Sequence, residues 1–310
     1  MALPNFVIVG APKCGTSSLA HWLRDHPEIG RSEIKEPFYL LDADRAAARA
    51  GDTPHYRRDG LEGYERLFES CAEDPVRFEA TTHYLYMETA REVLAGFDTP
   101  PKILVMTRQP ADRVFSSYQF EVNRLGNLDA SVRFPELVER VLGGDVEPIR
   151  ARCRYEGTFL TVTTDIAHSR YVDYVGPWKQ RFGDKLRVHL IEDMRGRERE
   201  FVKSLASWLD VDPAFFDTYD FPSMNRGVQV RSQGLHRLAR EVTKRVRLPD
   251  AAKSFVRQTY QRLQFKRPSE QGAEERRTLA RLDALFAPSN EALAELIERP
   301  DLVARWEKTR

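Results

Sequence analysis

Cysteine is scarce in this sequence, and the few cysteines form no pattern. The 310 residues include three of them, Cys14, Cys71 and Cys153, and none stands in a CxxC pair or in the Cys/His spacing of a zinc site. We therefore expect neither a disulfide framework nor a structural zinc site, and a reducing compartment fits this composition.

Long hydrophobic runs are also missing. No stretch of about 18 apolar residues occurs, which is the length that a membrane-spanning helix requires. The sequence reaches the apolar segment NFVIVG (residues 5–10) at once, with no positively charged leader before it. We therefore expect a cytoplasmic protein without integral membrane contact.

An excess of one charge is absent as well. Lysine plus arginine number 48 and aspartate plus glutamate 47, which gives a formal net charge of +1. Proteins that bind nucleic acid through the field of the whole chain carry a larger positive balance. No nucleic-acid partner is expected, and local clusters of charge have to be considered separately.

Four short apolar runs alternate with helical patterns along the chain. They are NFVIV (5–9), VRFEA (76–80), KILVM (102–106) and LRVHLI (186–191). Such alternation favours a parallel sheet with crossover helices on both faces. We predict a single α/β domain over residues 1–310, with a three-layer, P-loop-like fold and a central, mainly parallel sheet flanked by helices.

Two parts of the chain depart from this alternation. Residues 120–170 contain polar turns and the aromatic-bearing segment CRYEGTFL. We expect an acceptor-binding or lid insertion there, because long connections in compact domains are often functional. Residues 234–310 read as helical and at first basic, and LARLDALFAPSNEALAELI (279–297) has the apolar spacing of one or two packed helices.

The first apolar run leads into GAPKCGTSS (10–18), which matches a phosphate-binding loop in its glycines but not in its lysine. A Walker loop reads G-x-x-x-x-G-K-[ST], whereas here Thr16 takes the lysine position and Lys13 comes earlier. Backbone N–H groups and hydroxyls at such a helix start still favour an anion. A tight strand-to-helix turn with Ser or Thr as N-cap is the alternative.

A second motif follows the run at residues 102–106. The segment TRQPADRVFSSY places Arg108 at the carboxyl end of the expected strand and Ser116 eight residues later, at the start of an expected helix. In P-loop kinases and GTPases this strand commonly supplies an aspartate for magnesium. An arginine can instead hold a phosphate bidentately, and a structural ion pair of Arg108 is the alternative.

Taken together, the two motifs resemble the sulfotransferases that use 3′-phosphoadenosine 5′-phosphosulfate (PAPS). APKCGTSSL is similar to the 5′-phosphosulfate loop of that family, and TRQPADRVFSSY is similar to its 3′-phosphate element. HPEIGRSEIKEPFYL (26–40) and YVDYVGPWKQRFGDKLRVHLIEDM (171–194) resemble segments of its heparan-type and bacterial members. The resemblance runs from residue 5 to residue 290 and is weakest over 120–165 and 235–270.

The resemblance implies how the donor is held. The residues that would hold its 5′-phosphate are Cys14, Gly15, Thr16, Ser17 and Ser18. Lys13 would offset charge on the leaving phosphoadenosine, and Arg108 and Ser116 would select the 3′-phosphate that ATP lacks. A sulfuryl group carries less charge than a terminal phosphoryl group, so no metal is expected. The product would be adenosine 3′,5′-bisphosphate (PAP).

For the general base the resemblance leaves two candidates. Glu36 lies in IKEPFYL, where heparan-type members carry a catalytic glutamate beside a lysine, here Lys35. His83 in EATTHYLY is the rival, because phenol-type members use a histidine after the second strand. Pro37 predicts extended backbone angles at Glu36, and Phe38 stands where many members carry a histidine. A surface Lys–Glu pair and an ordinary loop histidine are the alternatives.

Residues 236–267 form the basic part of the chain, with ten Lys or Arg against two acids. A solvated helix face is the common explanation of such a run. The alternative is a basic flap that closes on the donor or guides an anionic acceptor, and Lys266 and Arg267 in FKRPSE would then approach the donor most closely.

The resemblance implies a sulfotransferase that moves a sulfuryl group from PAPS, by in-line transfer, to a hydroxyl or an amine. The acceptor stays open among small molecules, lipids and carbohydrates, and the oligomeric state stays open too. Two alternatives come from other classes. A P-loop nucleotide kinase is disfavoured by Thr16 and by the missing aspartate, and a catalytically silent nucleotide-binding module would keep the fold without the reaction.

Overall fold

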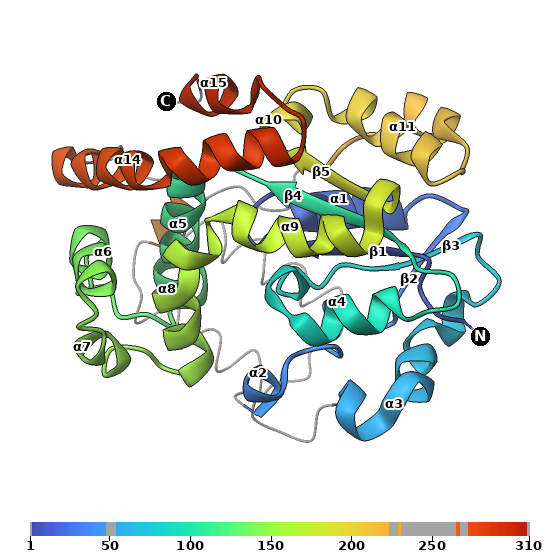
Figure 1. Cartoon of the computed structure of the whole chain (residues 1–310), viewed down its shortest axis with the longest axis horizontal. Helices are drawn as coiled ribbons and strands as arrows, with labels where there is room; N and C mark the ends of the chain where they lie inside the picture. Colours follow the sequence, from blue (N-terminus) through green and yellow to red (C-terminus); the bar gives the residue numbers. More distant parts are fainter. Residues whose placement is uncertain (1, 48–53, 223–228, 231–264, 267–271, 309–310) are drawn as a thin grey trace. The chain divides into compact units, whose positions relative to one another are not determined.

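The chain folds around a central parallel sheet of five strands, in the order β2-β3-β1-β4-β5 (Figure 1). The computed structural model describes residues 2–47, 54–222, 229–230, 265–266 and 272–308. The strands of the sheet are β1 (Phe6–Gly10), β2 (Ile29–Arg31), β3 (Val76–Glu79), β4 (Lys102–Thr107) and β5 (Leu186–Leu190). The predicted α/β fold with a parallel sheet is confirmed.

Continuous apolar sequence explains the centre of the sheet. Every residue of β1 is buried, and so is every residue of β4 except Lys102. Strands that are covered on both faces have this composition, rather than the alternation of a half-exposed strand. All strands of the sheet but β2 coincide with the predicted runs. β2 was missed because three residues at the edge of a sheet are too short to show a period.

Helices account for most of the remaining described structure. The α-helices are α1 (Thr16–Arg24), α2 (Ala43–Ala47), α3 (Tyr56–Glu65), α4 (Glu88–Ala95), α5 (Pro110–Gln119), α6 (Phe134–Gly143), α7 (Glu147–Arg150), α8 (Glu156–His168), α9 (Tyr171–Phe182), α10 (Ile191–Met194), α11 (Glu198–Trp208), α14 (Ala273–Leu296) and α15 (Leu302–Glu307). Short 3₁₀-helices are η1 (Arg66–Cys71), η2 (Tyr84–Tyr86), η4 (Gly183–Lys185) and η5 (Pro213–Asp217), and η3 (Phe120–Leu125) is a π-helix.

The connections between parallel strands set the layers around the sheet. From β1 the chain moves through α1 to β2 at one edge, whereas from β3 to β4 and from β4 to β5 it moves the opposite way. Because such crossovers are right-handed, α1 covers one face and α4 and α9 cover the other. Figure 1 shows α4 and α9 side by side in front of the strands, with α1 behind them.

The strand order therefore switches between the parallel neighbours β1 and β4: the chain leaves β1 toward one edge of the sheet and leaves β4 toward the other. Gly10 pairs with Val105, and the backbone N–H of Ala11 donates to the carbonyl of Met106 at 2.7 Å. The loops that follow these two strands leave the same edge of the sheet, side by side. Open α/β sheets bind their ligands at such a switch point.

The described residues fall into two compact units. The bounds of the first are Met1–Arg113, Ala167–Asn225 and Leu285–Arg310, and those of the second are Val114–Ile166 and Arg226–Ala284. The first unit contains the sheet. The second includes most of the segment 120–170, where we expected an insertion; its use as a lid and the assignment of the chain to a single domain stay predictions.

The second unit has a hydrophobic cluster of its own. The cluster is formed by Val122, Leu128, Val132, Leu137, Ile149 and Val162. A β-bridge joins Leu128 to Cys153, and β6 (Gln229–Val230) pairs antiparallel with β7 (Phe265–Lys266). Of the basic segment 236–267, only 265–266 belong to the described residues.

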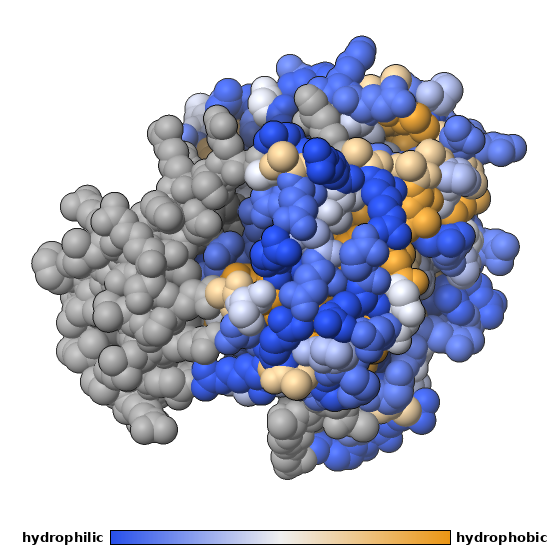
Figure 2. Space-filling model, turned by 90° about the vertical axis from the view of Figure 1, so that its left-hand side faces the viewer, coloured by the Kyte–Doolittle hydropathy of each residue, from blue (hydrophilic) through white to orange (hydrophobic). Residues whose placement is uncertain are grey.

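The C-terminal pattern is confirmed as one helix rather than two. α14 continues through Pro288, and α15 follows it. Among the described residues, no helix combines the length and the apolar character needed to cross a membrane. Where it is coloured, the face in Figure 2 is mostly hydrophilic, with hydrophobic residues in small patches.

Candidate active site

The loop 11–15 turns the chain sharply from β1 into α1. Lys13 and Gly15 both have left-handed backbone angles, with φ of 70° and 84°. Gly15 is the N-cap of α1, and its carbonyl accepts the N–H groups of Ser18 and Leu19. The first turn of α1 carries no acidic residue. The N–H groups of Thr16 and Ser17 have no backbone carbonyl partner among the described residues, so this end of α1 attracts an anion.

Glycine is strongly favoured at position 15. Its φ of 84° is unfavourable for residues with a side chain, and a Cβ atom there would lie 2.9 Å from Cδ1 of Ile191. Ile191 is the first residue of α10, directly after β5. The loop is therefore packed closely against the end of another strand, which fixes its shape.

Cys14 belongs to the core rather than to the surface of the loop. Its side chain is fully buried, and its Sγ lies 3.5 Å from the carbonyl oxygen of Pro12 and 3.5 Å from the hydroxyl of Tyr171. Burial raises the pKa of the thiol to about 11. Any contribution of Cys14 to the predicted phosphate site therefore comes from its backbone N–H.

Thr16, Ser17 and Ser18 form the start of α1. The Thr16 side chain is buried, whereas those of Ser17 and Ser18 are half-buried, as is that of Lys13. The structure therefore leaves two hydroxyls and one cation partly accessible at the predicted phosphate site. Their assignment to a phosphate stays a prediction.

Arg108 follows β4 and lies at the neighbouring end of the sheet. The Nε atom of its guanidinium is buried and has no hydrogen-bond partner among the described residues, and Arg108 forms no ion pair with any of them. The structural ion pair that was its alternative role is therefore not seen in this part of the chain. A buried donor without a partner costs about 1–3 kcal/mol, and a phosphate oxygen would satisfy it.

Tyr171 connects Arg108 to the loop 11–15. The N–H of Arg108 donates to the Tyr171 hydroxyl at 3.3 Å, and the hydroxyl donates to the carbonyl of Arg108 at 3.0 Å. The same hydroxyl lies 3.5 Å from Sγ of Cys14. Tyr171 is 1% exposed, and burial raises its pKa well above the ordinary value. One neutral side chain thus contacts both motifs, and the sequence alone gave no sign of it.

The predicted start of the next helix at Ser116 is wrong. α5 already begins at Pro110. Proline suits a first helical position because it has no N–H that would need a partner and because its φ is already helical. Ser116 is half-buried in the interior of that helix and falls in the second unit. Its part in holding a phosphate stays a prediction.

Arg113 is a buried cation that the predicted site did not include. It is fully buried, with Nη1 donating to Oγ of Ser169 at 2.9 Å and Nη2 donating to the hydroxyl of Tyr86 at 3.1 Å. The Tyr86 ring stacks on His168, with 3.8 Å between centroids, and burial lowers the pKa of His168 to about 2. The charge of Arg113 lowers the pKa of the Cys14 thiol against the effect of burial, so its field reaches the loop 11–15.

The two candidates for the general base lie close together. Oε1 of Glu36 accepts a hydrogen bond of 3.3 Å from Oγ1 of Thr82, the residue before His83. The His83 ring lies 5.5 Å from that of Phe38. Glu36 and His83 are both half-buried, and Lys35 is exposed and forms no ion pair with a described residue. The surface Lys–Glu pair is therefore not seen, and the choice between the two bases stays open.

The expectation of extended angles at Glu36 is wrong. Glu36 has a φ of 52° and Phe38 a φ of 54°, both in the left-handed region. Side chains of the facing segment impose this turn. Oγ1 of Thr81 accepts the N–H of Phe38 at 3.5 Å. The Tyr84 hydroxyl accepts the N–H groups of the two residues that follow Phe38, at 2.9 and 3.1 Å.

Glu79, at the end of β3, is a buried carboxyl beneath this turn. It is fully buried and accepts hydrogen bonds from the hydroxyls of Tyr64 and Thr81. Burial raises its pKa from 4.5 to about 7, the hydroxyls act in the opposite direction, and the charge of Glu36 raises it further. Glu79 is therefore a buried titratable group whose pKa depends on the charge of the candidate base Glu36.

Two further predicted donor ligands, Lys266 and Arg267, come from the basic segment 236–267. Lys266 is in β7 of the second unit, and Arg267 lies outside the described residues. Their contact with the donor stays a prediction. In the described part of the chain, no group of three or more His, Cys, Asp or Glu is arranged to hold a metal ion.

Comparison with known proteins shows the family of this chain. A family model described as "Sulfotransferase domain" matches residues 3–220, and the chain belongs to this family. The sulfotransferase from Alicyclobacillus acidocaldarius is a similar solved structure, with a TM-score of 0.63 and 25% identity over 98% of this chain and 99% of that chain.

Curated relatives match at lower coverage. Heparan sulfate glucosamine 3-O-sulfotransferase 3A1 from Mus musculus is 24% identical over 84% of this chain and 62% of its own length. Membrane-associated sulfotransferase kil1 from Dictyostelium discoideum is 28% identical over 40% of this chain and 24% of its own length. The chain therefore spans less than two thirds of these relatives.

Proposed function

We propose that this chain is a sulfotransferase that transfers a sulfuryl group from PAPS to a hydroxyl or an amine of an acceptor. The observation that carries this proposal is Arg108, whose buried Nε has no partner among the described residues. It lies beside the loop 11–15 at the point where the sheet order reverses. Membership in the sulfotransferase family supports the same reaction.

The residues present fit a donor with phosphates at both ends of its ribose. The start of α1 and the loop 11–15 offer backbone N–H groups and the hydroxyls of Ser17 and Ser18 to a 5′-phosphosulfate. Arg108, on the adjacent strand end, offers a guanidinium to a 3′-phosphate. The donor supplies an activated sulfuryl group, and no residue of the chain has to form a covalent bond to it.

The protein's part in the transfer is to move a proton and to stabilise charge. Glu36 accepts the proton of the acceptor hydroxyl while the acceptor oxygen forms its bond to sulfur. The bond between sulfur and the bridging oxygen of the donor breaks at the same step, and its electron pair leaves with PAP. Lys13 offsets the negative charge that develops on this bridging oxygen. His83, next to the Thr82 that bonds Glu36, is the alternative base.

The acceptor class that we propose is a small molecule, a lipid or a carbohydrate. One similar protein is named as acting on glucosamine in heparan sulfate, which supports a carbohydrate hydroxyl as the first acceptor to try. We also keep the cytoplasm as the proposed location and expect catalysis without a bound metal.

A turnover assay tests the reaction. The purified chain is incubated with PAPS and a panel of phenols, lipids and oligosaccharides in the presence of EDTA, and PAP and sulfated product are quantified together. We expect equimolar PAP and sulfated product with at least one acceptor. A kinase would instead transfer phosphate from ATP with magnesium. If no panel member is sulfated although PAP binds, the silent binding module replaces the enzyme as the better account.

A further inference from the structure

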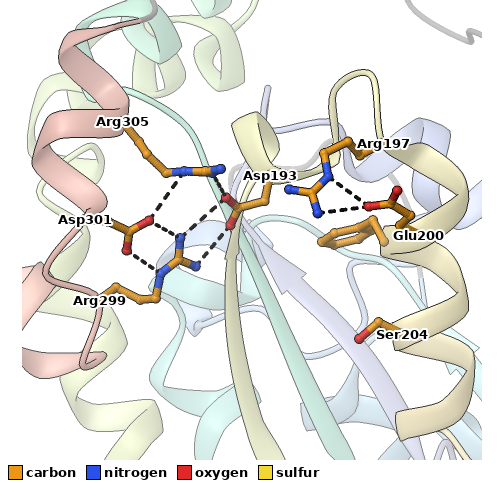
Figure 3. A pocket seen from close by; sticks show the side chains of 8 residues that line it. Asp193, Arg197, Glu200, Ser204, Arg299, Asp301 and Arg305 are labelled. Carbon is orange, nitrogen blue, oxygen red and sulfur yellow. Dashed lines mark hydrogen bonds and ion pairs between the residues drawn. The ribbon is translucent and has the colours of Figure 1, made fainter.

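The C-terminal residues of the chain form a charged cluster against the end of β5. We define the C-terminal anchor as Arg299, Asp301, Arg305 and Trp306, on α15 and just before it. These residues lie beyond the segment 3–220 that matches the family model. Figure 3 shows that Arg299 and Arg305 both point toward Asp193 of α10.

Ion pairs hold the C-terminal anchor in place. Arg299 donates to both carboxylate oxygens of Asp193, at 3.1 and 3.4 Å, and Arg305 donates to Oδ1 of Asp193 at 2.7 Å. Asp301 accepts from Nε of Arg299 at 2.9 Å, and this hydrogen bond raises the pKa of Arg299. Asp193 is half-buried, and a network of this kind is worth more than isolated surface pairs.

Glu192, the residue before Asp193, extends this network to the candidate active site. Its Oε2 accepts the indole N–H of Trp306 at 3.2 Å. Its Oε1 accepts the backbone N–H of Gln109 at 3.3 Å. Gln109 directly follows Arg108, so one carboxylate joins the C-terminal anchor to the segment that carries the candidate 3′-phosphate ligand.

The position of Arg108 depends on such tethers. β4 ends at Thr107, so the pairing between strands no longer fixes the backbone at residues 108 and 109. Side chains take over this role, with Tyr171 on Arg108 and Glu192 on Gln109. The Trp306 ring also lies 6.2 Å from that of Tyr171, so the C-terminal anchor is next to both tethers.

We infer that the C-terminal anchor is a positioning element for donor recognition, and that Glu192 transmits its effect to Arg108. A guanidinium that holds a phosphate needs a fixed approach, and a small displacement of its backbone lowers the benefit of the contact. The inference rests on the proposed function, because it assumes that Arg108 binds the 3′-phosphate. It adds residues that the family model does not cover.

Two conservative variants test this inference. Trp306→Phe removes the indole N–H and keeps an aromatic ring, and Glu192→Gln places an N–H₂ group against one of its two donors. Arg197→Ala is the matched control, because Arg197 lines the same pocket but pairs with Glu200 on α11 (Figure 3). Isothermal titration calorimetry gives the dissociation constants of PAP and of adenosine 5′-phosphate for each protein.

The ratio of the two dissociation constants is the decisive readout. We expect both variants to lose about tenfold of the preference for PAP, with adenosine 5′-phosphate binding unchanged, whereas Arg197→Ala keeps the parental ratio. Unfolding temperatures are measured without ligand. If the variants melt earlier but keep the parental ratio, the C-terminal anchor is purely structural and the inference is overturned. Should Trp306→Phe fail to fold, Glu192→Gln decides by the same ratio.

The same titrations separate this inference from the proposed function. If the parent protein itself binds PAP no better than adenosine 5′-phosphate, the assignment of Arg108 fails and the inference fails with it. If the parent prefers PAP and the variants keep that preference, only the inference about the C-terminal anchor is wrong.

Discussion

The Tyr171 hydroxyl closes two hydrogen bonds with the backbone of Arg108, accepting from its N–H at 3.3 Å and donating to its carbonyl at 3.0 Å. It does so from the first residue of α9, 63 positions along the chain. The sulfur of Cys14 lies 3.5 Å from the same oxygen. One hydroxyl thereby links the segments that follow β1 and β4.

The first prediction concerns Tyr171→Phe. Removal of the hydroxyl leaves two backbone groups of Arg108 without their buried partner, which costs about 1–3 kcal/mol of unfolding free energy. We also expect weaker PAP binding, because the backbone of Arg108 is no longer fixed. Urea unfolding and calorimetric titration measure the two effects. Tyr219→Phe is the control, since its hydroxyl makes an exposed bond to Asp25. Equal stability of the two variants would contradict the role given to Tyr171.

The second prediction separates the two cations of the site. Lys13→Ala should lower kcat about 10²–10³-fold and change PAP affinity much less, because Lys13 acts where charge develops. Arg108→Ala should weaken PAP binding by about 1.5–3 kcal/mol and leave adenosine 5′-phosphate binding unchanged. Arg181→Ala, which removes an exposed charge paired with Glu92, is the control for charge alone. A parental preference for PAP in the Arg108 variant would remove Arg108 from the site.

The third prediction assigns the general base. Glu36→Gln keeps the shape of the side chain but no longer accepts a proton, so kcat should fall about 10²–10⁴-fold with PAP binding intact. His83→Asn should retain most of the turnover. Steady-state kinetics and calorimetry on both variants decide the assignment. The opposite pattern, with activity lost in His83→Asn and kept in Glu36→Gln, would move the base to His83.

The fourth prediction concerns the buried carboxyl of Glu79, whose pKa burial raises from 4.5 to about 7. The folded state then binds the proton more tightly than the unfolded state. Glu79 therefore contributes stability that is complete below pH 4.5 and is lost as the pH rises through 7, by about 3 kcal/mol in total.

Unfolding free energies from pH 4.5 to 8 test this linkage. As the pH rises, the unfolding free energy of the parent should fall relative to that of Glu79→Gln. Glu62→Gln, at an exposed position of α3, should follow the parent throughout. Parallel curves for the parent and Glu79→Gln would show that Glu79 does not titrate in this range.

Parts of this structure that depend on neighbouring residues could be predicted from the sequence. The runs at 5–9 and 102–106 are buried on both faces, so their composition alone identified β1 and β4. The two motifs follow these strands directly, and because parallel neighbours end at the same edge, their meeting follows from the sheet order. Gly15 has the left-handed angle that a glycine in such a loop indicates.

Features that depend on distant partners escaped the sequence. Glu36 was expected to be extended before Pro37, but hydrogen bonds to Thr81 and Tyr84 hold its segment in a left-handed turn. Tyr171 reads as an ordinary helical aromatic residue until Arg108 is placed beside its hydroxyl. Glu79 reads as the end of a strand, because its burial and its hydrogen bond from the hydroxyl of Tyr64 depend on other elements of the fold.

The most direct test of the account is a comparison of two nucleotides on the parent protein. Calorimetric titration with PAP is set beside titration with ATP and magnesium. The account predicts saturable PAP binding and weaker binding of ATP. It also predicts that PAP, at a concentration 100 times its dissociation constant, raises the free energy of unfolding by about 2.7 kcal/mol. Tight binding of ATP with magnesium and no binding of PAP would contradict it and support a P-loop kinase instead.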